Sequence, residues 1–338
     1  MQMLDKILSS SLECYRVTVR FYPADDVCLD AWIGAVFRNR FLYFAESVCD
    51  ENMGVSLRER LDELPLLPEH AYYNQMKGGF PKGVFFDFRD ITRKCRKGIL
   101  SQNIYAFHIV FIGTSVRLFP MAVQALEKMF AYGIGHPLKQ LNLLDIVEQG
   151  PDGKNRLLYG GNSASLNMPE NAIRISDYEA DINEFADIRL TFHTPTSLYQ
   201  LKEKAQPELS YQHKMNGFPS FYQLVRSLTY RWASLSMLYG NDFSEVEAKV
   251  LEKELDAFAE SSSLAFLDEA TLRRRKIYGT PKKESRYVYV MEGYEGEMVF
   301  KKVSCRYLPL LFWGMYAAVG NNVQYGMGNY SVEVIPRQ

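Results

Sequence analysis

Residues 104–135, IYAFHIVFIGTSVRLFPMAVQALEKMFAYGIG, contain the pattern from which the fold can be inferred. The opening IYAFHIVFIG is apolar and rich in β-branched and aromatic residues, which predicts a buried strand. Arg117-Leu-Phe-Pro120 then leads into a helical run, because a proline is tolerated in the first helical turn, where its missing N–H is not needed. Gly133 suits the position just after that helix. The segment LNLLDIVE, which follows, predicts a further strand.

The same unit recurs near the C-terminus. The strand-like segment GEMVFKKVS leads into Arg306-Tyr-Leu-Pro309 and the helical run LLFWGMYAAV. Gly320, the loop NNVQYGMG and the strand-like NYSVEVI follow. Each unit therefore has the order strand, Arg-x-x-Pro, helix, glycine, strand.

Each unit is preceded by another strand and helix. In the first half, CYRVTVRFY alternates polar and apolar residues, and apolar spacing from Trp32 to Phe41 predicts a helix. In the second half, ADIRLTFHTP predicts a strand, and the run from Pro219 to Gly240 is the clearest helix of the chain. GVFFDFRDI and RKIYGTPKKESRYVYVME are the expected middle strands. The order β-α-β-β-α-β thus occurs twice, which predicts an α+β fold of two tandem ferredoxin-like (RRM-like) domains.

The chain of 338 residues is long enough for two such domains. We expect an N-terminal domain over residues 1–184 and a C-terminal domain over 185–338, divided after the acidic stretch DYEADINE. Two segments do not fit the repeated unit. Residues 151–180 are expected to form an extra hairpin, and residues 241–260 an extra acidic helix.

The composition is that of a soluble globular protein, with 47% hydrophobic and 23% charged residues and a formal net charge of −1. No apolar run reaches the ~20 residues of a membrane helix, so no membrane partner is expected. The five cysteines are scattered, which argues against disulfides and zinc and favours a cytoplasmic location. Walker, dinucleotide-binding and GxSxG motifs are absent, which excludes several enzyme classes.

Four segments together resemble a known family. They are WIGAVFR (32–38), RLFP through Gly135 (117–135), LTFHTPTSL (190–198) and GNNVQYGMGNY (320–330). In this order they resemble the RAMP superfamily and, within it, the sixth numbered CRISPR-associated family. Those proteins are endoribonucleases that cut precursor CRISPR RNA at each repeat.

The resemblance implies CRISPR repeat RNA as the partner and a reaction without metal or other cofactor. A 2′-hydroxyl would attack the adjacent phosphate and leave a 2′,3′-cyclic phosphate and a 5′-hydroxyl. The resemblance also allows other Cas effector subunits as partners, and a homodimer is an open alternative. Two further functions stay open: an RNA-binding RAMP protein that does not cut, and a structural subunit of a CRISPR effector complex.

The family usually draws a catalytic histidine from the region of the first helix, and this chain departs from that pattern. Residues 1–68 contain no histidine. His136, which directly follows a glycine-containing turn, is the first candidate for acid–base catalysis, and His213 is the second. Tyr43, with Arg38 and Arg40 to hold the phosphate, is the alternative at the usual place.

RNA contacts are expected from the last loop and from basic segments. Glycines permit close backbone approach, exposed N–H groups in such a loop can hold phosphate oxygens, and amide side chains donate hydrogen bonds without charge. Lysine and arginine neutralise phosphates, while aromatic side chains stack on bases. The expected loop residues are Gly320, Asn321, Asn322, Gln324, Gly326 and Gly328. The expected basic residues are Arg273, Arg274, Arg275, Lys276, Lys282, Lys283, Lys301 and Lys302.

Overall fold

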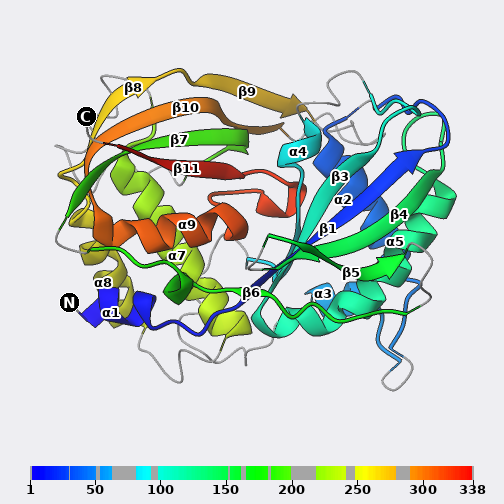
Figure 1. Cartoon of the computed structure of the whole chain (residues 1–338), viewed down its shortest axis with the longest axis horizontal. Helices are drawn as coiled ribbons and strands as arrows, with labels where there is room; N and C mark the ends of the chain where they lie inside the picture. The colour runs from blue at the N-terminus through cyan, green and yellow to red at the C-terminus, as the bar shows by residue number, and fades with distance from the viewer. Residues whose placement is uncertain are drawn as a thin grey trace.

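The computed structural model shows two antiparallel sheets side by side, each with its helices (Figure 1). The structure describes residues 2–29, 31–50, 54–62, 81–92, 98–150, 153–160, 165–181, 184–198, 218–240, 248–278 and 290–336. The predicted sites His213, Lys282 and Lys283 lie outside these residues. Within the described ranges, no helix combines the length and the apolar character that crossing a membrane requires.

The N-terminal sheet has the ferredoxin-like strand order β2-β3-β1-β4, extended by β5 at one edge. Its core strands are β1 (Cys14–Pro23), β2 (Val84–Asp87), β3 (Tyr105–Ile112) and β4 (Leu141–Gln149). The helices α2 (Ile33–Ala45) and α5 (Phe119–Tyr132) complete the β-α-β-β-α-β unit. The predicted proline stands in the first turn of α5, and Gly133 is its C-cap.

The C-terminal sheet repeats this order as β11-β7-β10-β8, with β9 also paired to β10. Its strands are β7 (Phe185–Thr196), β8 (Phe266–Ala270), β9 (Arg273–Tyr278), β10 (Val290–Ser304) and β11 (Tyr330–Ile335). The helices of this unit are α7 (Phe221–Tyr239) and α9 (Leu308–Ala317). The predicted fold class, α+β with two ferredoxin-like units, is therefore confirmed.

The remaining elements decorate these two units. They are α1 (Gln2–Leu8), α3 (Leu57–Asp62), α4 (Arg89–Thr92), β5 (Asn155–Gly160), β6 (Ala172–Ile173) and α8 (Ala248–Glu260). Short 3₁₀ turns are η2 (Gly113–Leu118), η3 (Ile175–Asp177), η4 (Cys305–Tyr307) and η5 (Val323–Tyr325). The segment 275–292, expected as one middle strand, instead contains the end of β9 and the start of β10, which pair with each other.

The N-terminal sheet is covered on both faces. Phe107, Ile109 and Phe111 of β3 pack in the core that α2 and α5 share with this sheet. Val110 and Ile112, on the opposite face of the same strand, belong to the core of the C-terminal half. The alternation of side chains along β3 thus joins one half to the other.

The helix α1 packs on the C-terminal half, although it lies at the start of the chain. Met3 and Ile7 are buried in the core of that half. Lys6 pairs with Glu254 of α8 at 3.2 Å, and Ser10 accepts a hydrogen bond from Trp232 Nε1 at 3.0 Å. The division at residues 184 and 185 coincides with the start of β7. As a boundary between folding units it stays a prediction.

Candidate nucleic-acid interface and active site

The segment from residue 318 to 329, between α9 and β11, is the glycine-rich loop, and its backbone needs its glycines. Gly320, Gly326 and Gly328 have φ values of 82°, 73° and 80°, in the region where side chains cause strain. A Cβ on Gly328 would lie 2.0 Å from the carbonyl oxygen of Val319, and one on Gly320 would lie 2.3 Å from that of Ser197. The glycines therefore allow the loop to fold closely on itself and on the end of β7.

Several N–H groups of this loop are already donated to carbonyls. Those of Asn321 and Gly328 reach the end of β7, at 2.9 and 3.1 Å, and that of Gly326 is donated within the loop at 2.8 Å. Other N–H groups of the loop and the amide side chains would therefore make the contacts with phosphate oxygens. Asn321 is exposed, and Asn322 and Gln324 are half-buried.

The loop packs against the first long helix of the other half. Trp32, just before α2, donates its indole N–H to the carbonyl of Tyr325 at 2.7 Å. The same carbonyl approaches Gly34 so closely that a Cβ there would lie 1.8 Å from it. The guanidinium of Arg38 lies over the ring of Tyr325, 4.7 Å from its centre. The two segments WIGAVFR and GNNVQYGMGNY, nearly 300 residues apart, therefore meet in space.

The strand β9 joins the same place from the C-terminal half. Arg275 lies over the ring of Trp32, 5.1 Å from its centre. Its guanidinium also pairs with Glu295 at 2.8 Å, and Arg273 pairs with the other oxygen of that buried carboxylate at 2.9 Å. We call Trp32, Arg38, Arg275 and Tyr325 the junction cluster. It places two guanidinium groups and two aromatic rings where the halves meet, a combination suited to phosphates and bases.

The run of arginines in β9 does not form one uniform basic surface, because side chains of a strand alternate between its faces. Arg273 and Arg275 lie on the face that carries Glu295. Arg274 stands opposite Tyr294 on the other face and pairs with Glu292 at 2.6 Å. Each predicted RNA-binding arginine thus has an acidic neighbour, and the local positive charge is smaller than the sequence RRRK suggests.

Lys276, the next predicted basic residue, is exposed in β9 and stands opposite Glu292. Lys301 and Lys302 lie elsewhere. Lys301 pairs with Asp268 at 2.9 Å, and Lys302 lies over the ring of Phe266 at 5.9 Å. Both stand near the far end of β10, roughly 30 Å along the strand from Glu292 at about 3.3 Å per residue.

The candidate catalytic side chains of the N-terminal half do not all face the junction cluster. Arg38 and Arg40 are two helical positions apart, so they point about 160° away from each other around α2. Arg40 lies over the ring of Tyr132 in α5, at 5.0 Å. Tyr43 is 61% exposed and packs edge-on against Phe44. Of the predicted group, the structure brings only Arg38 to the glycine-rich loop.

His136 lies in the turn after α5. Its side chain is exposed, and its backbone N–H donates to the carbonyl of Cys28 at 3.3 Å. The turn is closed by a bridge between Ile134 and Lys139. These contacts place His136 within its own half.

A partly buried polar network lies on the face of the N-terminal sheet that meets the other half. His108 contacts Thr18 Oγ1 at 2.9 Å through Nδ1 and Asp90 at 2.8 Å through Nε2. Burial lowers the pKa of His108, and the hydrogen bond with His108 lowers the pKa of Asp90 to about 2. His108 is therefore a buried histidine with both ring nitrogens in contact.

Arg89 connects this network to both ends of the glycine-rich loop. Its Nε donates to the buried Asp87 carboxylate at 2.8 Å. Its other nitrogens donate to the carbonyls of Met315, before the loop, and Tyr330, after it. Burial acts to raise the pKa of Asp87, but the guanidinium groups of Arg89 and Arg16 hold it below its usual value. Sequence reasoning missed this role, because the carbonyls that Arg89 contacts belong to residues more than 200 positions further along the chain.

Comparisons with known proteins add to this geometry. The family model described as CRISPR-associated endoribonuclease Cas6 matches residues 190–330. A search of curated proteins found no match. A solved Cas6 product complex shares 14% identity with a TM-score of 0.55, over 95% of this chain and 99% of that one.

A partial Cas6-RT-Cas1–Cas2 complex shares 12% identity with a TM-score of 0.51. The match covers 97% of this chain and 47% of that chain, so this protein spans about half its length. Identities this low show a shared fold. The chain thus resembles the CRISPR-associated Cas6 endoribonucleases in the sequence of its C-terminal half and in the fold of both halves, and the resemblance predicted from its sequence is confirmed.

Proposed function

We propose that this protein binds CRISPR repeat RNA at the junction of its two halves and cleaves it. The observation that carries the proposal is the junction cluster, in which Arg38 and Tyr325 stack beside Arg275 and Trp32. Guanidinium groups neutralise phosphates, and aromatic faces accept unpaired bases. The family match over residues 190–330 supports repeat RNA as the nucleic acid.

The proposed reaction is a transesterification that needs no metal. The 2′-oxygen of one nucleotide forms a bond to the adjacent phosphorus while the bond to the 5′-oxygen of the next nucleotide breaks. A general base takes the proton of the 2′-hydroxyl, and a general acid gives a proton to the departing 5′-oxygen. The products are a 2′,3′-cyclic phosphate and a 5′-hydroxyl. Positive charge on the phosphate would stabilise the transition state.

The residues proposed for these roles differ in how well their positions suit them. Arg38 stands at the junction and is proposed to hold the phosphate. His136 and Tyr43 are exposed and are proposed as acid–base groups. Arg40, three residues before Tyr43 on α2, is proposed as the alternative to Arg38 for holding the phosphate. His213 keeps its proposed role and lies outside the described residues.

The test is incubation of the purified protein with repeat RNA of its own organism, in EDTA. Cleavage at one site, with a cyclic phosphate on the upstream product and a 5′-hydroxyl on the downstream one, is the expected result. Cleavage that requires added metal would contradict the proposed chemistry.

A second candidate function is RNA binding without cleavage. It is favoured by one observation: Arg40 points to α5 and Arg38 to the glycine-rich loop, so the candidate groups on α2 are divided between two sides. Tight repeat-RNA binding with no product in the same assay would select this function.

Partner Cas subunits and a homodimer are proposed as well, and size-exclusion chromatography of the purified protein tests the homodimer.

A further inference from the structure

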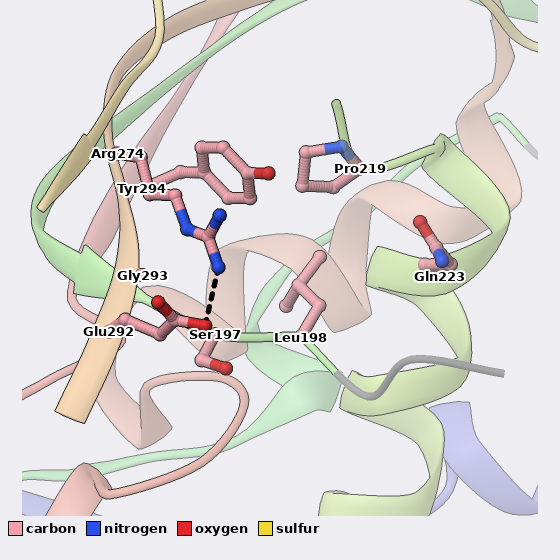
Figure 2. Close-up of a pocket in the computed structure, with 8 residues that line it drawn as sticks. All are labelled: Ser197, Leu198, Pro219, Gln223, Arg274, Glu292, Gly293 and Tyr294. Atoms are coloured by element: carbon pink, nitrogen blue, oxygen red, sulfur yellow. Dashed lines mark hydrogen bonds and ion pairs between the residues drawn. The ribbon is translucent and has the colours of Figure 1, made fainter. Parts of the chain in front are cut away.

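A small cleft opens beside the glycine-rich loop, on the face of β9 and β10 that is turned away from the junction cluster. It lies between the end of β7, the start of α7, and these two strands (Figure 2). Its lining residues are Ser197, Leu198, Pro219, Gln223, Arg274, Glu292, Gly293 and Tyr294. In Figure 2, the strand residues Arg274, Glu292 and Tyr294 stand on one side, and Pro219 and Gln223 stand on the other.

The strand side of the cleft offers a donor beside an acceptor. Arg274 donates to Glu292 Oε1 at 2.6 Å, and their side chains are 55% and 40% exposed. The pair therefore holds a guanidinium fork next to a carboxylate, with both heads reachable from solvent. As an isolated surface ion pair it would contribute little to stability.

The cleft also has apolar surfaces against which a flat ring can pack. Tyr294 stands directly opposite Arg274 in the β9–β10 pairing, so the two share a face of the sheet. Its ring is held by an edge contact with Phe218, 6.3 Å between centres. Leu198 and Pro219 are buried and face the same space (Figure 2). Unpaired bases are commonly recognised by such a combination of a stacked face and a hydrogen-bonded edge.

The cleft is joined to the glycine-rich loop by one residue. Ser197 lines the cleft, and its carbonyl accepts the N–H of Asn321 at 2.9 Å. RNA that follows the loop would pass the mouth of this cleft.

We propose that the cleft takes the base of one unpaired guanine in the bound RNA. Guanine presents, in a row, the O6 acceptor and the N1–H and N2–H donors. Arg274 would donate to O6, and the two oxygens of Glu292 would accept from the two donors. Guanine is the base that offers two adjacent donors to a carboxylate, so the array selects it. This inference rests on the proposed function, because it assumes that RNA reaches the loop.

The test compares short oligouridines that carry one guanine, one inosine or one 7-deazaguanine at the same position. Inosine lacks the 2-amino group, whereas 7-deazaguanine keeps the whole recognised edge. We expect the wild-type protein to bind the guanine and 7-deazaguanine probes equally and the inosine probe about fivefold or more weakly. Glu292→Gln should abolish this difference. Glu269→Gln, which removes an exposed carboxylate from β8 in the same sheet, is the matched control and should keep it.

The possible failures are distinguishable. If neither the probes nor repeat RNA bind, the proposed function fails, and this inference with it. If RNA binds but guanine and inosine are bound alike, or if Glu292→Gln keeps the difference, the inference alone is overturned. Circular dichroism of each variant checks that loss of discrimination is not loss of folding.

Discussion

The loops that follow α5 and α9 occupy the same place in the two halves, yet they contact different partners. After α5, the segment from Gly133 to Gln140 folds back on its own half, where a Cβ on Gly135 would lie 2.5 Å from the Val27 side chain. After α9, the glycine-rich loop packs on the other half, against Trp32 and Gly34. The loop after the second helix of the unit thus packs on its own half in the N-terminal unit, whereas in the C-terminal unit it connects the two halves.

Because the two loops contact different partners, substitutions in them should have different consequences. A change in the loop after α9 should alter the junction and therefore the binding of any RNA that spans it. A change in the loop after α5 should stay local unless His136 takes part in the reaction.

The largest expected effect tests whether the first loop is more than local. If His136 is an acid–base group, His136→Ala should lower the single-turnover cleavage rate about 10²–10⁴-fold with RNA affinity nearly unchanged. Rapid-quench kinetics with labelled repeat RNA measures it. Equal rates for variant and parent would remove His136 from the reaction, and Tyr43→Phe in the same assay then tests the other exposed candidate.

The second prediction concerns Arg89, which donates to carbonyls on both sides of the glycine-rich loop. Arg89→Met keeps the apolar stem but leaves the buried Asp87 with one ion-pair partner, Arg16. We expect a loss of about 3–5 kcal/mol in the free energy of unfolding, the usual cost of breaking a buried pair. Urea denaturation measures it. Arg117→Met, at an exposed arginine after β3, is the control and should change stability by less than about 0.5 kcal/mol.

The third prediction is that a glycine-to-alanine substitution in α2 destabilises the protein, which is the opposite of its usual effect in a helix. Replacing glycine by alanine inside a helix normally stabilises it by up to about 1 kcal/mol. In Gly34→Ala the new methyl group would meet the carbonyl of Tyr325, so we expect a net destabilisation of about 1–3 kcal/mol together with weaker RNA binding. Thermal unfolding and filter binding measure the two effects. A more stable variant would mean that the loop does not rest on α2.

Much of the fold could be predicted from the sequence, because the repeated strand, Arg-x-x-Pro, helix and glycine are local signals that the structure keeps. The strand pairing of residues 275–292 was not predictable in this way. Periodicity shows that a segment is extended, but it does not show where one strand turns into the next.

The candidate site was less predictable, and the physical reasons differ by residue. Trp32 and Tyr325 stood in segments singled out for their family resemblance, but their contact depends on tertiary packing that no local pattern encodes. Arg273 to Arg275 read as free charges because Glu292 and Glu295, their partners, are contributed by the next strand. Counting charge along a chain thus overestimates a basic patch whenever a neighbouring strand carries the counter-charges.

The fourth prediction divides β9 by its two faces. Replacing Arg273 and Arg275 by Gln should weaken RNA affinity and flatten its dependence on salt, since these residues border the junction cluster. The slope of log affinity against log salt should fall by roughly one, because Glu295 already offsets one of the two charges. Arg274→Gln should leave the slope closer to that of the wild type. An unchanged slope in the double variant would place the RNA path away from β9.

The smallest effect is a dependence of stability on pH that arises from the network between the halves. The folded-state pKa of His108 lies below its ordinary value near 6.5, because the ring is buried. As the pH falls through this value, the unfolded chain takes up a proton that the folded chain does not, so folding becomes less favourable.

For one proton the change cannot exceed about 1.4 kcal/mol per pH unit. The pKa values of Asp87 and Asp90 are also lowered, but they act only below pH 4 or so, where their unfolded forms become protonated. Urea unfolding at pH 7, 6 and 5 should therefore show a decline in wild-type stability that is smaller in His108→Gln, whose amide can still bond to Thr18 and Asp90. Parallel curves for the two proteins would show that His108 titrates alike in both states. The contact between the halves would then owe its acid sensitivity to other groups.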